Sequence, residues 1–86
     1  MNYRVLIDAR AARFLESLVN LLVNRIDEAI LALAANPRPS GCKLLKGRLG
    51  EGWRIRVGQY RILYRIDDEA REVRIFNIGH RREIYR

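Results

Sequence analysis

The chain has 86 residues, of which 49% are hydrophobic and 31% are charged, and its formal net charge is +7. This length predicts one domain, residues 1–86, and the apolar content is too high for a disordered protein. No run of about 18 apolar residues occurs, which excludes a membrane-spanning helix of the usual kind. The N-terminus lacks the layout of a signal peptide and Cys42 is the single cysteine, so we expect a cytoplasmic protein.

The first half of the chain predicts a strand followed by two helices. Residues 3–7 have the composition of a short strand, and Asp8 is placed to cap the helix that follows. No Gly or Pro interrupts residues 9–35, which predicts helix throughout this span. Its apolar residues fall into two stripes, one around Phe14 and one around Ile26. The stripes favour a helical hairpin that bends near residues 19–20.

The second half predicts a loop, a β-hairpin, a further strand and a basic tail. Two prolines within residues 36–39 end the helical half, and residues 40–52 contain four glycines, which predicts a loop. A short strand at residues 43–45 is an alternative within this loop. Residues 53–66 alternate on both sides of Gly58-Gln59, which is typical of a hairpin with a two-residue turn. A polar turn at 67–71 and a strand at 72–78 follow, and residues 79–86 form the tail.

The predicted hairpin separates apolar residues from arginines. A turn at Gly58-Gln59 places Arg56 directly opposite Arg61. The core face then carries Trp53, Ile55, Val57, Tyr60, Ile62 and Tyr64. The other face carries Arg54, Arg56, Arg61 and Arg65 and is predicted to be exposed. Opposed like charges destabilise a strand pair by up to about 1 kcal/mol, so we expect a function to retain them.

The order of elements predicts the fold class. In the last strand Val73 and Ile75 point to one face and Phe76 and Ile78 to the other, which indicates an interior strand. The order β-α-α-β-β-β predicts an α+β domain. In it, the N-terminal helical hairpin packs on one face of a small, twisted, mostly antiparallel sheet.

The distribution of charge indicates a polyanionic partner. Residues 1–40 have five arginines and four acids, whereas residues 41–86 have twelve cations and six acids. Fifteen of the seventeen cations are arginine, whose planar guanidinium suits bidentate contact with phosphate. The second half therefore favours binding of a polyanion.

The remaining side chains limit the chemistry. One His, one Cys and acids confined to turns do not provide a zinc site, and we expect neither a metal nor another cofactor. No acid is placed to form a Ser-His-Asp set with His80, and no glycine-rich phosphate loop precedes a helix. A cluster of cations with an imidazole and a phenol is left: Arg54, Arg56, Arg61, Arg65, His80, Arg81, Arg82 and Tyr85. Such a cluster suits RNA binding or, less directly, phosphodiester cleavage.

The sequence resembles the RelE/ParE superfamily of toxins, on the RelE side. The segments that carry the resemblance are AANPRP, LKGRLGEGWRIRVGQYRILYRIDDE and VRIFNIGHRREIYR, which together extend over much of the chain. The resemblance implies the toxin of a type II toxin–antitoxin system. It further implies a ribosome-dependent endoribonuclease that cuts mRNA in the ribosomal A site. A cognate RelB-like antitoxin is the partner expected to hold it inactive.

The resemblance also implies roles for single residues. The catalytic candidates are Arg61, Arg81 and Tyr85. The RNA-binding candidates are Arg54, Arg56, His80, Arg82, Lys43 and Lys46. An arginine stays protonated and cannot act as a general base, so Tyr85 and His80 are the candidates to accept the ribose 2′-OH proton. Two alternatives stay open, a ParE-like inhibitor of DNA gyrase and a non-catalytic RNA-binding module.

Overall fold

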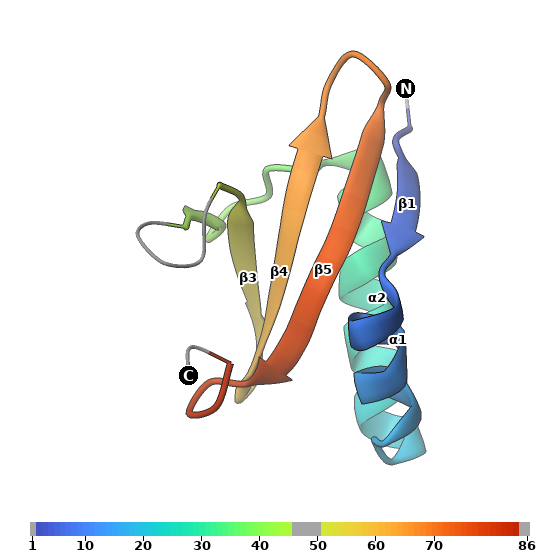
Figure 1. Cartoon of the computed structure of the whole chain (residues 1–86), viewed down its shortest axis with the longest axis vertical. Coiled ribbons are helices and arrows are strands. Elements are labelled where there is room, and N and C mark those ends of the chain that lie inside the picture. Colours follow the sequence, from blue (N-terminus) through green and yellow to red (C-terminus); the bar gives the residue numbers. More distant parts are fainter. Residues whose placement is uncertain (1, 46–50, 85–86) are drawn as a thin grey trace.

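A computed structural model of the chain describes residues 2–45 and 51–84. The elements, in chain order, are β1 (Arg4–Ile7), α1 (Ala9–Glu16), α2 (Asn20–Ala35), β2 (Lys43–Leu44), β3 (Trp53–Val57), β4 (Tyr60–Asp67) and β5 (Glu72–His80). The strands form one sheet in the order β1-β5-β4-β3-β2, and both helices lie on the same side of it (Figure 1). None of the helices in the described residues is both long and apolar enough to cross a membrane.

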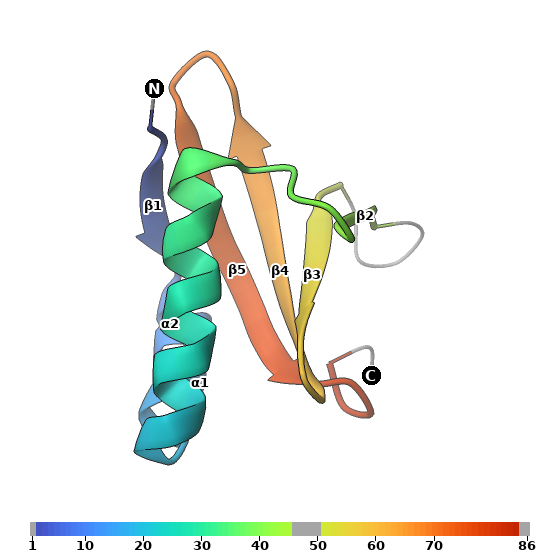
Figure 2. The ribbon, with the colours of Figure 1, turned by 180° about the vertical axis from the view of Figure 1, so that it is seen from behind.

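The sheet is antiparallel except at one edge. β1 runs parallel to β5, whereas the pairs β5–β4, β4–β3 and β3–β2 are antiparallel. The two helices carry the chain from β1 to the opposite edge, and seen from behind they lie over the side of the sheet formed by β1 and β5 (Figure 2). The predicted α+β architecture is confirmed. The short strand predicted as an alternative at residues 43–45 is β2, which adds a fifth strand to the sheet.

The helical hairpin bends where the sequence predicts it. α1 ends at Glu16, where the Ser17 hydroxyl donates to the Phe14 carbonyl oxygen at 2.6 Å, and α2 begins at Asn20. Asp8 occupies the N-cap position with extended backbone angles, as predicted. Its carboxylate does not cap the helix, however, because Arg74 donates to it at 2.8 Å.

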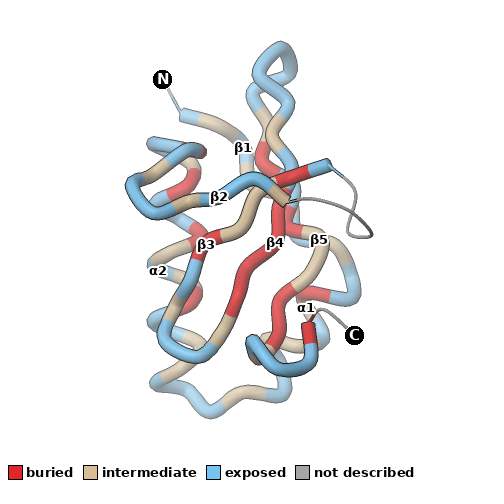
Figure 3. The backbone as a smooth tube through the Cα atoms, turned by 90° about the vertical axis from the view of Figure 1, so that its left-hand side faces the viewer, coloured by how far each residue is buried: buried red, intermediate tan, exposed pale blue. Residues whose placement is uncertain are grey.

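The β3–β4 hairpin has the predicted register. Ile55 pairs with Ile62 and Arg56 with Arg61, and Gly58 has φ +59°, which a two-residue turn of this kind requires at its first position. The core joins the hairpin to the helices and to β5. Its buried members are Ala11, Ile26, Ile30, Leu33, Ile55, Ile62, Tyr64, Val73, Ile75 and Ile78. Figure 3 shows that buried residues concentrate in the central strands, whereas the turns are exposed.

β5 differs from its prediction in its length and in the orientation of one residue. It continues to His80, two residues beyond the predicted end at Ile78. The strand is interior, as expected, but Ile78 lies in the core with Val73 and Ile75, so its predicted orientation was wrong. The reason is a β-bulge. Leu63 pairs with Asn77 and the next residue, Tyr64, pairs with Ile75, which leaves Phe76 without a partner. The extra residue shifts the alternation, so each residue of β5 after Phe76 faces the side opposite to the one that strict alternation predicts.

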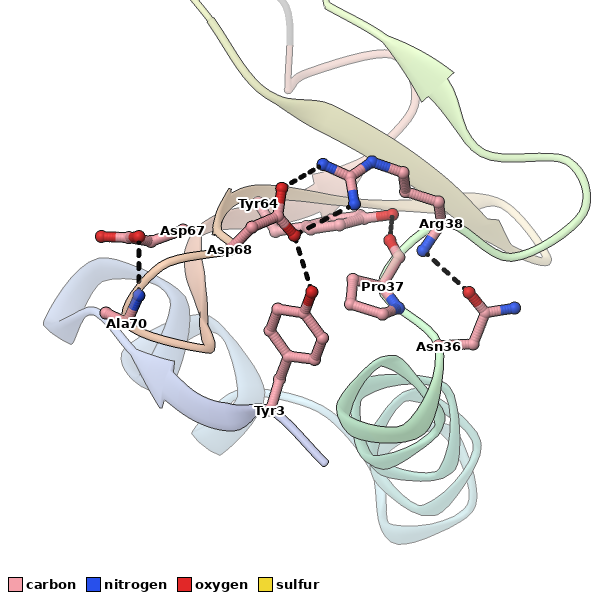
Figure 4. A network of polar contacts seen from close by, with 8 residues as sticks. All are labelled: Tyr3, Asn36, Pro37, Arg38, Tyr64, Asp67, Asp68 and Ala70. Atoms are coloured by element: carbon pink, nitrogen blue, oxygen red, sulfur yellow. Dashed lines mark hydrogen bonds and ion pairs between the residues drawn. The ribbon is translucent and has the colours of Figure 1, made fainter. Parts of the chain in front are cut away.

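A polar network joins three segments that are far apart in the sequence (Figure 4). The Tyr3 hydroxyl donates to Asp68 at 2.6 Å, and Arg38 donates to both carboxylate oxygens of Asp68 at 3.2 and 2.9 Å. Close by, the buried Tyr64 hydroxyl donates to the Pro37 carbonyl oxygen at 2.7 Å. The hydrogen bonds from Arg38 and Tyr3 lower the pKa of Asp68 to about 2. The network thus fastens the start of the chain and the segment after α2 to the β4–β5 turn.

Candidate nucleic-acid interface

The sheet face turned away from the helices carries a row of cations, and we call it the arginine face. Its side chains include Lys43, Arg54, Arg56, Arg61, Arg65, Arg74 and Phe76. The strand register places three pairs of cations directly opposite one another: Lys43 with Arg54, Arg56 with Arg61, and Arg65 with Arg74. The sequence predicted the middle pair alone. Each pair opposes folding, and the three together give this face a positive potential that suits an anion.

Acidic side chains of the described residues form no ion pair with the arginines of β3. The ion pairs within residues 2–45 and 51–84 join Arg4 to Glu72, Arg38 to Asp68, and Arg74 to Asp8. Of these three arginines, Arg74 is the one that belongs to the arginine face. None of these ion pairs involves Arg54 or Arg56, so the positive potential around β3 is available to an external ligand.

Arg61 occupies a different environment from the other cations of this face. The residue is 7% exposed, and its Nη1 donates to the Tyr60 carbonyl oxygen at 3.4 Å. Gly79 pairs with Arg61, and Ile84 packs over Gly79 so closely that a Cβ there would lie 3.3 Å from the Ile84 Cβ. The prediction that Arg61 is exposed was therefore wrong, because the turn after β5 covers this part of the face.

The burial of Arg61 is itself a functional signal. No other charged side chain among the described residues is buried. Removing a guanidinium from water costs free energy, and folds commonly retain such a cost where the charge serves a ligand or a reaction. Arg61 thus lies under the turn that follows β5, whereas its cross-strand partner Arg56 is exposed.

The C-terminal turn lies beside the tip of the hairpin (Figure 1). The Arg81 N–H donates to the Gln59 carbonyl oxygen at 2.9 Å, and the Ile84 N–H donates back to the His80 carbonyl oxygen at 3.0 Å. Arg81 and Arg82 are both exposed in this turn. Two of the predicted site residues are thereby brought to the end of the sheet where Arg56 and Arg61 face each other.

His80 does not join this group. It pairs with Tyr60 at the end of β5, and the two rings meet edge to face with centroids 5.7 Å apart. Tyr60 in turn contacts Phe14 of α1, so this stack belongs to the helix side of the sheet. The Nδ1 atom of His80 accepts the backbone N–H of Arg82 at 3.2 Å. Of the other predicted site residues, Lys43 lies on the arginine face, whereas Lys46 and Tyr85 are outside the described residues.

One arrangement on the arginine face escaped prediction. The guanidinium carbon of Arg65 lies 4.0 Å from the centroid of the Phe76 ring. Strict alternation along β5 places the Phe76 side chain on the face away from the core. Its contact with Arg65 on β4, however, depends on the bulge. No local sequence signal announces a bulge at this position.

The sequence and the fold match known toxins. The family model described as the ParE toxin of the type II toxin–antitoxin system parDE matches residues 5–85. Toxin RelG of Mycobacterium tuberculosis is 38% identical over 87 residues, which cover 100% of this chain and 99% of RelG.

Two solved complexes contain a chain of the same fold. The toxin–antitoxin complex RelBE2 of M. tuberculosis gives a TM-score of 0.82 at 32% identity, covering 93% of this chain and 99% of the matched chain. The archaeal RelE–RelB complex of Pyrococcus horikoshii gives a TM-score of 0.83 at 27% identity, covering 96% and 99%. The family match over nearly the whole sequence, the relative and the shared fold agree with the resemblance seen in the sequence. The chain belongs to the RelE/ParE superfamily and is a toxin of a type II toxin–antitoxin system.

Proposed function

We propose that this toxin is a ribosome-dependent endoribonuclease that cleaves mRNA in the ribosomal A site and so inhibits translation. The observation that carries the proposal is the set of opposed cations on the arginine face, centred on Arg56 and the buried Arg61. A polyanion that lies across the sheet offsets the repulsion within these pairs. The names of the relatives, RelG and RelE, support the RelE side of the superfamily.

The proposed reaction is attack by a ribose 2′-OH on the adjacent phosphorus. The new P–O2′ bond forms as the P–O5′ bond breaks, which leaves a 2′,3′-cyclic phosphate and a 5′-OH. A base accepts the 2′-OH proton, and the departing O5′ gains a proton. Arg61 and Arg56 stabilise the negative charge that develops on the non-bridging oxygens, with Arg81 reaching the same phosphate from the C-terminal turn.

Tyr85 is the side chain to which we assign proton transfer. Arginines stay protonated, and His80 lies on the helix side of the sheet. A neutral phenol is a poor base in water, so the reaction depends on accurate alignment of the 2′-OH with the phosphate. The ribosome supplies that alignment in this account, and isolated RNA is a poor substrate.

The proposed partner in the resting state is a RelB-like antitoxin. The two solved structures described above are complexes of a toxin with its antitoxin, and the archaeal antitoxin is RelB. An antitoxin segment that covers the arginine face, or displaces the turn at residues 81–84, would block the proposed chemistry. The proposed place of action is the cytoplasm, where mRNA is translated.

Primer extension on an mRNA translated by purified ribosomes tests this function. The wild-type protein is expected to produce new 5′ ends within codons, and little cutting when ribosomes are omitted. Arg61→Lys keeps the charge of the buried side chain but loses its planar fork, and is expected to cut about 10²-fold more slowly. Arg25→Ala, at an exposed position of α2 away from the arginine face, is the matched control and should cut like the wild type.

Inhibition of DNA gyrase is the second candidate, because the matching family model is described as a ParE toxin. A supercoiling assay with purified gyrase runs beside the cleavage assay. Gyrase inhibition by the wild type, without new 5′ ends on translated mRNA, would replace the nuclease proposal by the ParE activity.

A further inference from the structure

The end of the arginine face away from the hairpin tip carries a cation stacked on an aromatic ring. The guanidinium of Arg65 lies over the ring of Phe76, with 4.0 Å between its central carbon and the ring centroid. Phe76 is the unpaired residue of the β-bulge, and bulges near functional sites commonly redirect a side chain. Arg65 is exposed and Phe76 is half-buried, so the surface of the pair that faces solvent is the guanidinium plane.

The ring of Phe76 is held in place by backbone. A Cβ on Gly52 would lie 3.3 Å from the Phe76 Cε2 and 2.7 Å from the Tyr64 carbonyl oxygen. Gly52 has φ +151°, a conformation that other residues rarely adopt. Gly52 therefore packs against both the edge of the Phe76 ring and the backbone of β4. This packing fixes the position of the ring before any ligand binds.

Arg65 also lines an open groove of about 440 Å³. Its other lining residues are Leu44, Leu45, Glu51, Gly52, Trp53 and Ile66, so the groove extends from Arg65 past the edge of the arginine face to residues that alternate toward the other side of the strands. The leucines favour a ligand with an apolar face, and the Glu51 carboxylate disfavours a phosphate. A nucleobase meets both conditions, because its face is apolar and an exocyclic amino group on its edge donates to a carboxylate.

We propose that Arg65, supported by Phe76, is a stacking subsite for one nucleobase of the bound mRNA. The inference rests on the proposed function, because it presumes RNA on the arginine face. Arg65 is four positions after Arg61 along β4, a distance of about 13 Å in a strand. The subsite therefore holds a nucleotide beside the cleaved bond and contributes to codon preference, while the chemistry takes place at Arg61.

Cleavage rates at individual codons of a translated mRNA test the subsite. Arg65→Lys keeps the charge and loses the plane that stacks on a base. It is expected to lower kcat/KM about tenfold at the preferred codons, mainly through KM, and to narrow the differences among codons. Phe76→Leu keeps an apolar side chain without the ring and is expected to have the same effect, with its urea midpoint measured to confirm folding. Arg25→Lys is the control and should match the wild type at every codon.

The outcomes separate this subsite from the proposed function. Wild-type rates at every codon in Arg65→Lys would overturn the subsite and leave the nuclease intact. A fall in kcat at unchanged KM would overturn it as well, because it would place Arg65 in the reaction. An equal loss in Arg25→Lys would show a general effect of the substitution and likewise refute stacking. Absence of cleavage by the wild-type protein would overturn the proposed function and, with it, the subsite.

Discussion

The sequence places Arg61 on the correct face of the sheet but does not predict that this arginine is buried. The alternation of β4 predicts its face, but Arg61 is buried at the point where its partner Gly79 is covered by Ile84, and Ile84 belongs to a tail without a regular sequence pattern. This burial changes the choice of substitution. An alanine at position 61 would remove a buried side chain and leave a cavity, so lost activity could reflect lost packing. A lysine fills much of the same volume and keeps the charge.

The role of the Tyr85 hydroxyl can be tested by a substitution that removes this group alone. Tyr85→Phe keeps the ring and loses the hydroxyl, so we expect cleavage to fall roughly 10²-fold if the hydroxyl transfers a proton. Binding to mRNA-programmed ribosomes, measured by co-sedimentation, should stay near the wild-type level. A near-neutral Tyr85→Phe combined with weak binding by Tyr85→Ala would instead show that the ring stacks on a base.

Asp68 predicts a pH dependence of stability. Arg38 and Tyr3 lower its pKa from 3.8 to about 2 in the folded protein. Its contribution is therefore complete above the unfolded value, near pH 4, and is lost as the pH falls through 2. We expect Asp68→Asn to have a lower urea midpoint than the wild type at pH 7, with the difference shrinking below pH 4.

Glu69→Gln, in the same exposed turn, is the control for Asp68→Asn. A stability difference that stays constant from pH 7 to pH 2.5 would contradict the assigned role of Asp68. The sequence could not reveal this network, because Tyr3 and Asp68 are 65 residues apart and no periodic pattern links them.

Among the elements, the β3–β4 hairpin was predicted in full register and β5 was not. The register of the hairpin is determined by its local sequence, because a two-residue turn and strict alternation leave only one register that buries the apolar face. The bend between α1 and α2 was likewise visible as a break in the apolar stripes. The bulge at Phe76 is different, because it is defined by pairing with β4 across the sheet. Sequence periodicity therefore placed Ile78 on the wrong face.

Two glycines of the hairpin region make a matched pair for a test of backbone strain. Gly58 has φ +59° with no atom near its missing Cβ, whereas a Cβ on Gly52 would lie 2.7 Å from the Tyr64 carbonyl oxygen. We expect Gly58→Ala to cost about 1 kcal/mol of unfolding free energy, the usual cost of a left-handed alanine. Gly52→Ala should cost about 3 kcal/mol, because the backbone must also shift.

Urea denaturation of the two alanine variants measures these costs. Equal midpoints for the two variants would contradict the close packing of Gly52 against β4. The Gly52 variant also reports on the ring of Phe76, which contacts the same glycine.

At the scale of the whole molecule, the small domain and its charge of +7 lead us to expect strong coupling to an acidic partner. A chain of this size buries a modest share of its surface and has limited stability alone. Binding of the cognate antitoxin to the native state is expected to raise the melting temperature. At an antitoxin concentration about 100 times the Kd, the rise is on the order of 10 °C. Thermal unfolding at increasing antitoxin concentration measures it, and an antitoxin that stops cleavage without raising the melting temperature would contradict native-state binding.

The position of the cuts relative to the reading frame distinguishes cleavage in the ribosomal A site from cutting of exposed RNA. Cleavage in the ribosomal A site ties each cut to a codon, so one nucleotide inserted after the start codon should relocate the cuts to positions set by the new frame. Primer extension on the two translated mRNAs, with wild-type protein and with Arg61→Lys, provides the comparison. We expect cuts that follow the reading frame and that become about 10²-fold weaker in Arg61→Lys. Cuts that ignore the frame and persist without ribosomes, or wild-type rates in Arg61→Lys, would contradict it.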